Sequence, residues 1–245
     1  MIRNLLLISN STNAGEEYLA WPLEHIVTFL KGFNVHRVLF VPYAGVSLDP
    51  ETLNRSYDLY ESRVASIFKT HGLEVISIHH ASDPVLAVQN AESIMVGGGN
   101  TFHLVSSMHH YGIMEPMRKR VQQGIPFVGW SAGANVARPT MKTTNDMPIC
   151  EPPSFNCLNL VPFQINPHYL DANPAGHAGE TREQRINEFL IVNKDVTVAG
   201  LREGCLFNVS NDQMTLSGKR SLRVFRFGKE PQEFQPGENL DWLLK

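Results

Sequence analysis

The stretch FVGWSAGANVARP, residues 127–139, begins as an apolar run typical of a buried strand and leads into an expected helix through a serine that lies between two glycines. The glycines of the segment Gly129–Gly133 relieve the crowding of a sharp turn. Two interpretations are open: a plain glycine-rich turn between strand and helix, or a turn that exposes the Ser131 hydroxyl as a nucleophile. In the second case the Ala132 N–H, at the helix start, faces a developing oxyanion.

Short apolar runs alternate with amphipathic segments through the first half of the chain. Consecutive apolar residues are typical of strands buried on both faces of a parallel sheet. Such runs lie at residues 4–9, 37–42, 73–78, 93–98 and 125–130. Helical patterns occupy 19–30, 52–71 and the segment that begins at Asp83 and Pro84. This alternation predicts an α/β fold with a doubly wound, mostly parallel sheet.

The pattern changes after residue 138. Residues 138–180 are rich in Pro, Asn and Thr and have little periodicity, which is typical of a long loop that helps to build a site. A helix is then expected at 181–192, a strand at 196–201, and a small antiparallel portion at 205–209, 213–217 and 222–227. Because the chain shows no repeat and no linker, we expect one α/β hydrolytic domain over residues 1–245.

Composition narrows the function classes. The formal net charge of −3 and the absence of a basic run argue against a nucleic-acid partner. The apolar run Leu5–Ile8 is too short for a signal-peptide core or a membrane span. Cys150, Cys157 and Cys205 have no zinc-site spacing, so we expect reduced thiols in a cytoplasmic protein.

A second glycine-rich turn, VGGGNTFHL at 96–104, comes one strand–helix unit before the serine turn. A dinucleotide-binding fingerprint requires a glycine where Phe102 stands, so the motif does not favour a nucleotide site. Glycines permit close backbone approach with free N–H groups, and Gly99 is our choice for a second oxyanion donor. The alternative is a tight turn before a Thr-capped helix.

A serine nucleophile needs a base of nearly neutral pKa, which histidine supplies. Of the ten histidines, the pairs at 79–80 and 109–110 have the pattern of exposed residues near element ends. His168 differs, because it follows an apolar run and Pro167 stiffens the backbone before it. We therefore expect His168, as a loop residue, to be the base.

A carboxylate should orient the imidazole, and two candidates are open. Glu203 directly follows a predicted strand, so it would emerge at the same sheet edge as Ser131 if that strand is parallel. Asp146 lies in the long loop, fifteen residues after the serine. Spacing does not decide between them, and each also has a structural alternative: Asp146 as a turn cap and Glu203 as a solvated loop charge.

Seven segments, in this order, resemble peptidase E, the α-aspartyl dipeptidase family of serine peptidases: LLLISNST, PYAG, VGGGNTFHL, GWSAGAN, TTNDMPI, QINPH and GETREQR. The resemblance runs from about Leu5 to Arg226. It implies a fold similar to class I glutamine amidotransferases and a cytoplasmic serine exopeptidase that hydrolyses Asp-Xaa dipeptides. It also implies Ser131 as nucleophile and His168 as base, with both Asp146 and Glu203 at charge-relay positions. On strand-edge grounds we favour Glu203 as the direct partner of the imidazole.

An aspartyl substrate requires a cation, because a buried carboxylate is costly when unpaired. Thr181 and Gln184 fit a capping box, which places Arg182 in the first turn of a helix. On residue type alone Arg182 suits a surface ion pair, whereas the resemblance favours a carboxylate-binding role, with Arg185 one turn on as the fallback. Asn100, beside Gly99, is a candidate for binding the aspartyl side chain or the free amino group. The reaction requires no metal and no cofactor.

Two rival functions stay open from the sequence. One is a related hydrolase of an aspartyl polymer or an ester, similar to a cyanophycinase. The other is a non-catalytic α/β ligand-binding domain that uses GGGNT for phosphate, against which the missing third glycine and the absent Walker lysine argue. We expect a small peptide substrate as the partner, neither nucleic acid nor membrane, and leave a homo-oligomer open.

Overall fold

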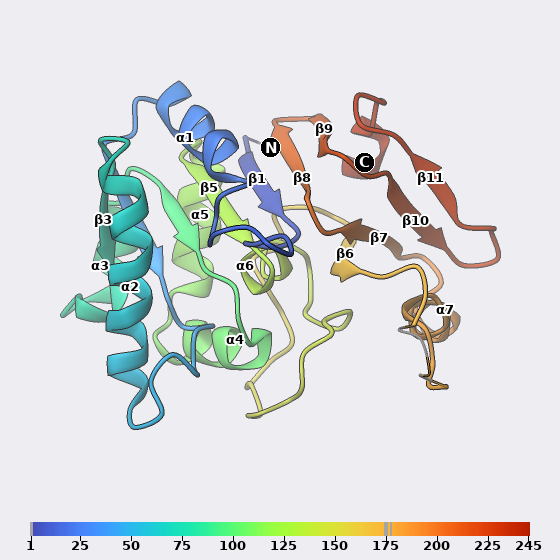
Figure 1. The fold of residues 1–245 in the computed structure, drawn as a ribbon, viewed down its shortest axis with the longest axis horizontal. Helices are drawn as coiled ribbons and strands as arrows, with labels where there is room; N and C mark the ends of the chain where they lie inside the picture. The colour runs from blue at the N-terminus through green and yellow to red at the C-terminus, as the bar shows by residue number, and fades with distance from the viewer. Residues whose placement is uncertain (1, 174–175, 177) are drawn as a thin grey trace.

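The computed structural model describes residues 2–173, 176 and 178–245. A seven-stranded sheet forms its centre (Figure 1). Its strand order is β3 (Glu74–Ser77), β2 (Arg37–Val41), β4 (Ile94–Val96), β5 (Pro126–Trp130), β1 (Asn4–Ile8), β8 (Cys205–Ser210) and β9 (Gln213–Gly218). The first five strands are parallel, whereas β8 is antiparallel to β1, and β9 is antiparallel to β8. The predicted mostly parallel sheet is confirmed.

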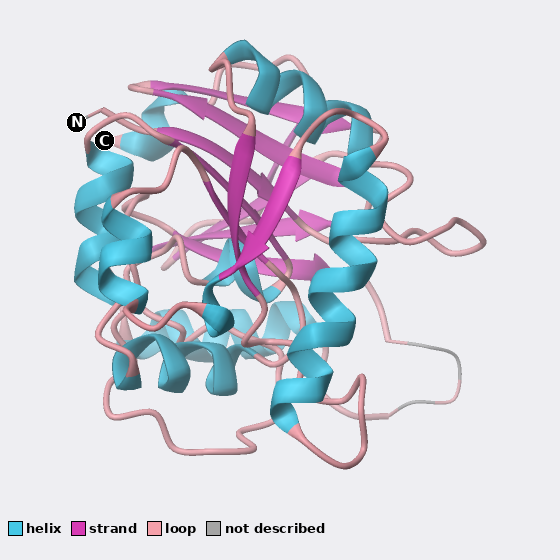
Figure 2. Cartoon of the chain, turned by 90° about the vertical axis from the view of Figure 1, so that its left-hand side faces the viewer, coloured by secondary structure: helices cyan, strands magenta, loops and turns pink. Residues whose placement is uncertain are grey.

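Helices cover both faces of this sheet (Figure 2). One face carries α1 (Leu23–Gly32) and α2 (Leu53–Lys69), and the other carries α3 (Pro84–Gln89), α4 (Thr101–His110), α5 (Met114–Gln122) and α6 (Ala132–Asn135). Two separate apolar cores result, and neighbouring residues of one strand, such as Leu5 and Leu6, contribute to different cores. Burial on both faces explains why these strands are apolar at consecutive positions. The sequence had not predicted α5.

A second sheet of four strands lies beside the first (Figure 1). Its order is β11 (Gln232–Phe234), β10 (Leu222–Arg226), β7 (Thr197–Arg202) and β6 (Gln164–Tyr169), with only β6 and β7 parallel. Helix α7 (Arg182–Val192) packs on it through Ile186 and Leu190. Assigning residues 164–169 to a loop was wrong. Pro167 weakens the strand signal, but an edge strand such as β6 tolerates proline.

Two one-turn 3-10 helices complete the described elements: η1 (Ile78–His80), which follows β3, and η2 (Asp241–Leu244). Leu240, Leu243 and Leu244 are buried, so the C-terminal apolar residues pack against the core. None of the described helices combines the length and the apolar character needed to cross a lipid bilayer.

The glycines around Ser131 are required by close backbone packing. A methyl group on Gly133 would lie 2.0 Å from the carbonyl oxygen of Val96 on β4. A methyl group on Gly129 would lie 2.3 Å from the carbonyl oxygen of Gly133. Because the obstructing atoms belong to the backbone, neither neighbour can rotate away, and only glycine fits at either position.

We expect Gly133→Ala to lower the free energy of unfolding by about 1–3 kcal/mol, the usual cost of forcing atoms into a packed interior. Gly32→Ala is the matched control, since an added methyl group there meets nothing within 4 Å. That control should be neutral or stabilising by up to about 1 kcal/mol, because alanine restricts the unfolded chain. Urea unfolding measures both, and equal midpoints for the two variants would contradict the packing argument.

Candidate active site

Ser131 lies where the carboxyl end of β5 meets α6. Its backbone has φ +53° and ψ −112°, a strained conformation for a residue with a side chain. The Ser131 N–H donates to the carbonyl oxygen of Ile8 on the neighbouring strand β1 (3.0 Å), and the Ser131 carbonyl accepts from the Asn135 N–H of α6 (2.9 Å). The turn is therefore fixed on both sides and has the strained geometry of a nucleophile elbow.

His168 lies at the carboxyl end of β6, where the register with β7 shifts between Pro167 and Tyr169. Its φ of +53° is again unusual for a residue with a side chain. The His168 N–H donates to Ser9 Oγ (3.0 Å), and Ser9 Oγ donates to the carbonyl oxygen of Leu201 on β7 (2.8 Å). His168 Nε2 lies 2.9 Å from Ser131 Oγ, within hydrogen-bond reach. The base expected in a loop is thus held on a strand.

Glu203 occupies the tight turn between β7 and β8, and its Oε1 lies 2.7 Å from His168 Nδ1. A carboxylate in this place accepts the Nδ1 proton, which leaves Nε2 as an acceptor for the Ser131 hydroxyl. The expectation that Glu203 shares a sheet edge with Ser131 was wrong, because β7 belongs to the second sheet. The serine comes from one sheet, and the imidazole and carboxylate come from the other.

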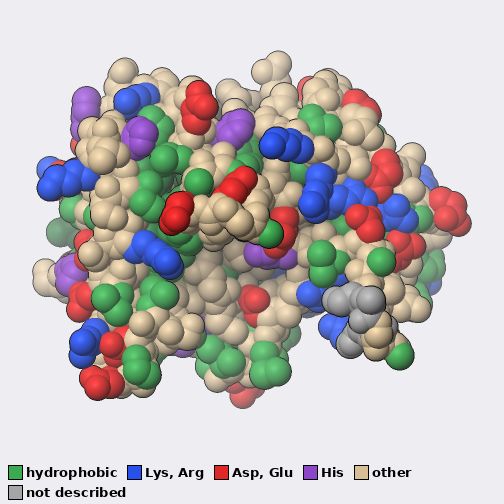
Figure 3. Space-filling model, viewed as in Figure 1, with side chains coloured by type: hydrophobic (Ala, Val, Ile, Leu, Met, Phe, Trp, Pro, Cys, Tyr) green, Lys and Arg blue, Asp and Glu red, His purple; other side chains and the backbone are tan. Residues whose placement is uncertain are grey.

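The turn that carries Glu203 is anchored at both of its neighbours. On one side, the Gly204 N–H donates to Asn10 Oδ1 (2.8 Å). On the other, the Arg202 guanidinium donates to Glu233 (2.9 Å) and pairs with Asp171. Hydrogen bonding to Arg202 lowers the pKa of Glu233 to about 2, despite an opposing effect of burial. In Figure 3, positively and negatively charged side chains lie close together over the second sheet, toward the right of the view.

Ser9 and Asn10 are positioning residues to which the sequence analysis gave no role. Both follow β1 directly, in the segment LLLISNST. That segment entered the family resemblance, and two polar residues at the carboxyl end of a central strand were the available signal. Asn10 is itself held, because its Nδ2 donates to the carbonyl oxygen of Thr12 and its carbonyl accepts from Trp21 Nε1.

The second glycine turn packs directly against the serine. A methyl group on Gly98 would lie 3.0 Å from Ser131 Cβ, and one on Gly99 would lie 2.1 Å from the carbonyl oxygen of Ala44. Gly99 has φ +134°, and its N–H has no acceptor among the described residues. The Ala132 N–H begins α6, so it has no acceptor within that helix. The two predicted oxyanion donors are therefore in neighbouring turns.

Asp146 lies away from the imidazole. Its Oδ2 accepts from the Thr101 N–H (2.7 Å) and from Thr144 Oγ1 (3.0 Å). Asn100 caps α4 by accepting from the His103 N–H, and its Nδ2 donates to the carbonyl oxygen of Met147 (2.8 Å). The structure thus places Glu203, and not Asp146, against His168. Asp146 and Asn100 join the loop around residues 143–149 to the start of α4, next to the Gly99 turn.

A cavity of about 500 Å³ opens over Ser131. Its lining includes the sequence-predicted residues His168, Gly99, Asn100 and Asp146. Three aromatic side chains, Tyr18, Tyr60 and Trp130, complete one wall and are joined by hydrogen bonds of 3.1–3.2 Å. Tyr60 also donates to the carbonyl oxygen of Gly98 (3.0 Å), and burial raises the pKa of its hydroxyl well above the usual range. Tyr60 therefore supports the glycine turn as a neutral phenol.

Arg182 lines a smaller neighbouring cavity of about 180 Å³, together with Arg185 and Asn166. The predicted capping box of Thr181 and Gln184 is confirmed, so Arg182 is the first residue of α7. Burial lowers the pKa of Arg182, nearby Arg185 lowers it further, and Asp146 opposes the shift.

The two cavities share Asp146 in their linings. Arg182 does not line the cavity over the serine. Arg63 of α2, which lies over the Tyr18 ring at 4.6 Å, does so. Arg63 was not predicted as a site residue, because its position in a helix of ordinary amphipathic pattern gave no signal.

Comparison with known proteins shows which family this chain resembles. The sequence profile of peptidase family S51 matches residues 5–217. Peptidase E of Nostoc sp. is 46% identical over 100% of this chain and 98% of its own length. Peptidase E of Streptomyces coelicolor is 46% identical over 98% and 95%. The crystal structure of a peptidase from an acI-B1 Actinobacterium has a similar fold, with a TM-score of 0.69 at 17% identity over 98% of this chain and 97% of that one.

Proposed function

The chain belongs to peptidase family S51, and on this premise we propose that it is a serine dipeptidase that hydrolyses dipeptides with N-terminal aspartate, Asp-Xaa. The observation that carries the proposal is the chain of contacts from Ser131 Oγ to His168 Nε2 (2.9 Å) and from His168 Nδ1 to Glu203 Oε1 (2.7 Å). A hydroxyl, an imidazole and a carboxylate in this order make a nucleophile, its base and the group that orients the base.

Acylation begins when His168 Nε2 accepts the Ser131 proton while Oγ attacks the aspartyl carbonyl carbon. Glu203 stabilises the imidazolium that forms. The carbonyl oxygen becomes an oxyanion, and the Gly99 and Ala132 N–H groups lie in the two turns that flank the serine. One such donor is typically worth about 10²–10³ in rate, so these turns supply a large part of the catalysis.

The tetrahedral intermediate then collapses. His168 Nε2–H gives its proton to the amine of the leaving residue, the C–N bond breaks, and aspartate stays as an ester on Ser131. In the second half, His168 takes a proton from water, and the hydroxide attacks the ester carbonyl. Free aspartate leaves and Ser131 regains its proton. Every proton in this sequence passes through His168, which is why the orientation of its ring by Glu203 matters.

Recognition of an N-terminal aspartate requires an anion and a cation side by side, because this residue carries an α-ammonium and a β-carboxylate. We assign the ammonium to Asp146, whose two intramolecular hydrogen bonds fall on Oδ2 and leave Oδ1 for the substrate. We assign the carboxylate to Arg182, which lies in the cavity on the other side of Asp146. Asn166, which also lines that cavity, lies two residues before His168 on β6. A substrate aspartate whose side chain reaches Arg182 therefore keeps its scissile carbonyl near His168.

Three further features support the proposal of one cytoplasmic dipeptidase domain. Residues of both sheets meet in one site, which supports a single hydrolytic domain. Asp146 and Ile149 of the long loop line the serine cavity, so we propose that this loop limits the substrate to a dipeptide. Cys150, Cys157 and Cys205 are free thiols, which fits a reducing compartment and a cytoplasmic location.

The triad assignment predicts separate effects for the two acidic candidates. Ser131→Ala should lower kcat/KM for Asp-Leu by at least about 10⁴-fold, and Glu203→Gln should lower kcat by about 10²–10⁴-fold, since the imidazole loses its orienting charge. Asp146→Asn should act mainly on KM. Steady-state kinetics with far-ultraviolet circular dichroism as the folding control measures this. A near-normal Glu203→Gln beside an inactive Asp146→Asn would transfer the orienting role to Asp146.

The two arginines predict a specificity test. Wild-type enzyme should prefer Asp-Leu over Asn-Leu, and Arg182→Ala should lower kcat/KM for Asp-Leu by about 10–100-fold without lowering that for Asn-Leu, because a charge-assisted pair is lost. Arg63→Ala is the matched control, as it removes the cation that lines the serine cavity, and should change the ratio of the two kcat/KM values by less than about threefold. If only Arg63→Ala lost the preference for Asp-Leu, the site that binds the aspartyl carboxylate would instead lie in the cavity over Ser131.

A further inference from the structure

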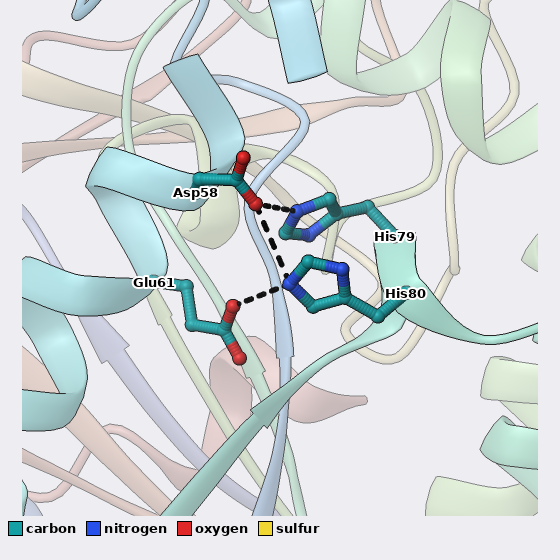
Figure 4. A group of neighbouring side chains, drawn as sticks. All are labelled: Asp58, Glu61, His79 and His80. Atoms are coloured by element: carbon teal, nitrogen blue, oxygen red, sulfur yellow. Dashed lines mark hydrogen bonds and ion pairs between the residues drawn. The ribbon is translucent and has the colours of Figure 1, made fainter. Parts of the chain in front are cut away.

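Two histidines and two carboxylates meet at the edge of the large sheet, away from the serine cavity (Figure 4). Asp58 and Glu61 lie one turn apart on α2, and His79 and His80 are consecutive in η1, directly after β3. None of the four lines the cavity over Ser131. The expected exposure of this histidine pair is wrong for His79, whose side chain is 6% exposed.

The ligand atoms of the four side chains converge. His79 Nε2 lies 3.0 Å and His80 Nε2 lies 3.5 Å from the same oxygen, Asp58 Oδ1, and His80 Nε2 lies 2.8 Å from Glu61 Oε2. All four ligand atoms lie within 4.8 Å of one another. Tetrahedral zinc with bonds of about 2.0–2.2 Å needs its ligand atoms about 3.3 Å apart. Three of the six separations, 2.8, 3.0 and 3.5 Å, are close to that value and the others do not exceed 4.8 Å, so side-chain rotations can bring the four ligand atoms into a tetrahedral arrangement.

Ser77 holds two of the four ligands in place. Its Oγ lies 2.6 Å from His79 Nδ1, and its backbone N–H donates to Glu61 Oε1 (2.9 Å). In the tautomer that donates from Nδ1 to the serine oxygen, the lone pair of Nε2 points toward the centre of the cluster. A bond to one oxygen of Glu61 leaves the other, Oε2, for a metal. Support of this kind, from a partner behind the ligand, is a regular feature of protein metal sites.

Burial makes the cluster one-sided. His79 and Glu61 have side chains 6% and 20% exposed, whereas Asp58 and His80 are 55% and 57% exposed. Two ligands are therefore fixed within the fold, and two lie at the surface, where an ion can enter from solvent.

We propose that Asp58, Glu61, His79 and His80 form a zinc site that joins α2 to the segment after β3. Two imidazole nitrogens with two carboxylate oxygens suit a tetrahedral first-row ion such as Zn²⁺, whereas Mg²⁺ and Ca²⁺ prefer oxygen ligands only. The ion crosslinks two elements, and it stabilises the folded chain because the unfolded chain lacks the preformed site. This site is independent of the proposed peptidase reaction.

The test is metal binding by the full-length protein after chelator treatment and dialysis. Calorimetric titration with Zn²⁺ should give one site per chain, Zn²⁺ should raise the thermal midpoint, and Co²⁺ at the same site should give the intense visible absorption of a tetrahedral complex. Asp58→Asn and His80→Ala change exposed ligands and should each weaken Zn²⁺ binding by at least about tenfold. Circular dichroism confirms that each variant is folded.

Two controls separate this site from other imidazoles. His110→Ala removes an exposed histidine of α4 outside the cluster, and His168→Ala removes the imidazole beside Ser131. Both should keep the Zn²⁺ affinity and the Co²⁺ spectrum of the wild type. The proposal is overturned if wild-type protein binds no Zn²⁺, if binding survives unchanged in folded His80→Ala and Asp58→Asn, or if His168→Ala alone abolishes it.

Discussion

The close approach of Gly133 to the carbonyl of Val96 is the constraint on which the rest of the site depends. A side chain at that position would lie 2.0 Å from a backbone oxygen, so glycine alone permits β5 to turn into α6 this close to β4. The same packing holds Ser131 in its strained conformation and places it against Gly98 of the neighbouring turn. The proposed nucleophile and the proposed oxyanion donors are thus positioned by one set of backbone contacts.

The proposed catalytic geometry requires the second sheet to be fixed on the first. Ser9, at the end of β1, accepts from the His168 N–H and donates to Leu201, and Asn10 accepts from the turn that carries Glu203. These two side chains, which directly follow β1, accept hydrogen bonds from the backbone of His168 and from the backbone of Gly204, next to Glu203, and so fix the main chain that carries the imidazole and the carboxylate. Arg202, anchored by Asp171 and Glu233, keeps the same turn in place from the far side. The proposed triad therefore lies at the junction between the two sheets.

Local signals explain what could be predicted from the sequence. Consecutive apolar residues indicated the parallel strands, and Thr181 with Gln184 indicated the start of α7, because both patterns depend on near neighbours. Strand β6 was missed since Pro167 lowers strand propensity, and only its edge position makes the proline tolerable. Spacing left open the choice between Asp146 and Glu203, because it does not encode which sheet a strand joins. His79 was predicted to be exposed, but its side chain contacts Tyr57 and Asp58 of α2, and sequence spacing does not encode contacts between segments this far apart.

Labelling of Ser131 tests the central claim most directly, that this hydroxyl is activated by His168 and Glu203. The enzyme is treated at neutral pH with a serine-directed fluorophosphonate, and intact-mass and peptide-mass spectrometry locate the adduct. The account predicts one adduct per chain, on the peptide that contains Ser131, formed much more slowly in Glu203→Gln. An unmodified Ser131, or equal labelling rates in wild type and Glu203→Gln, would contradict it.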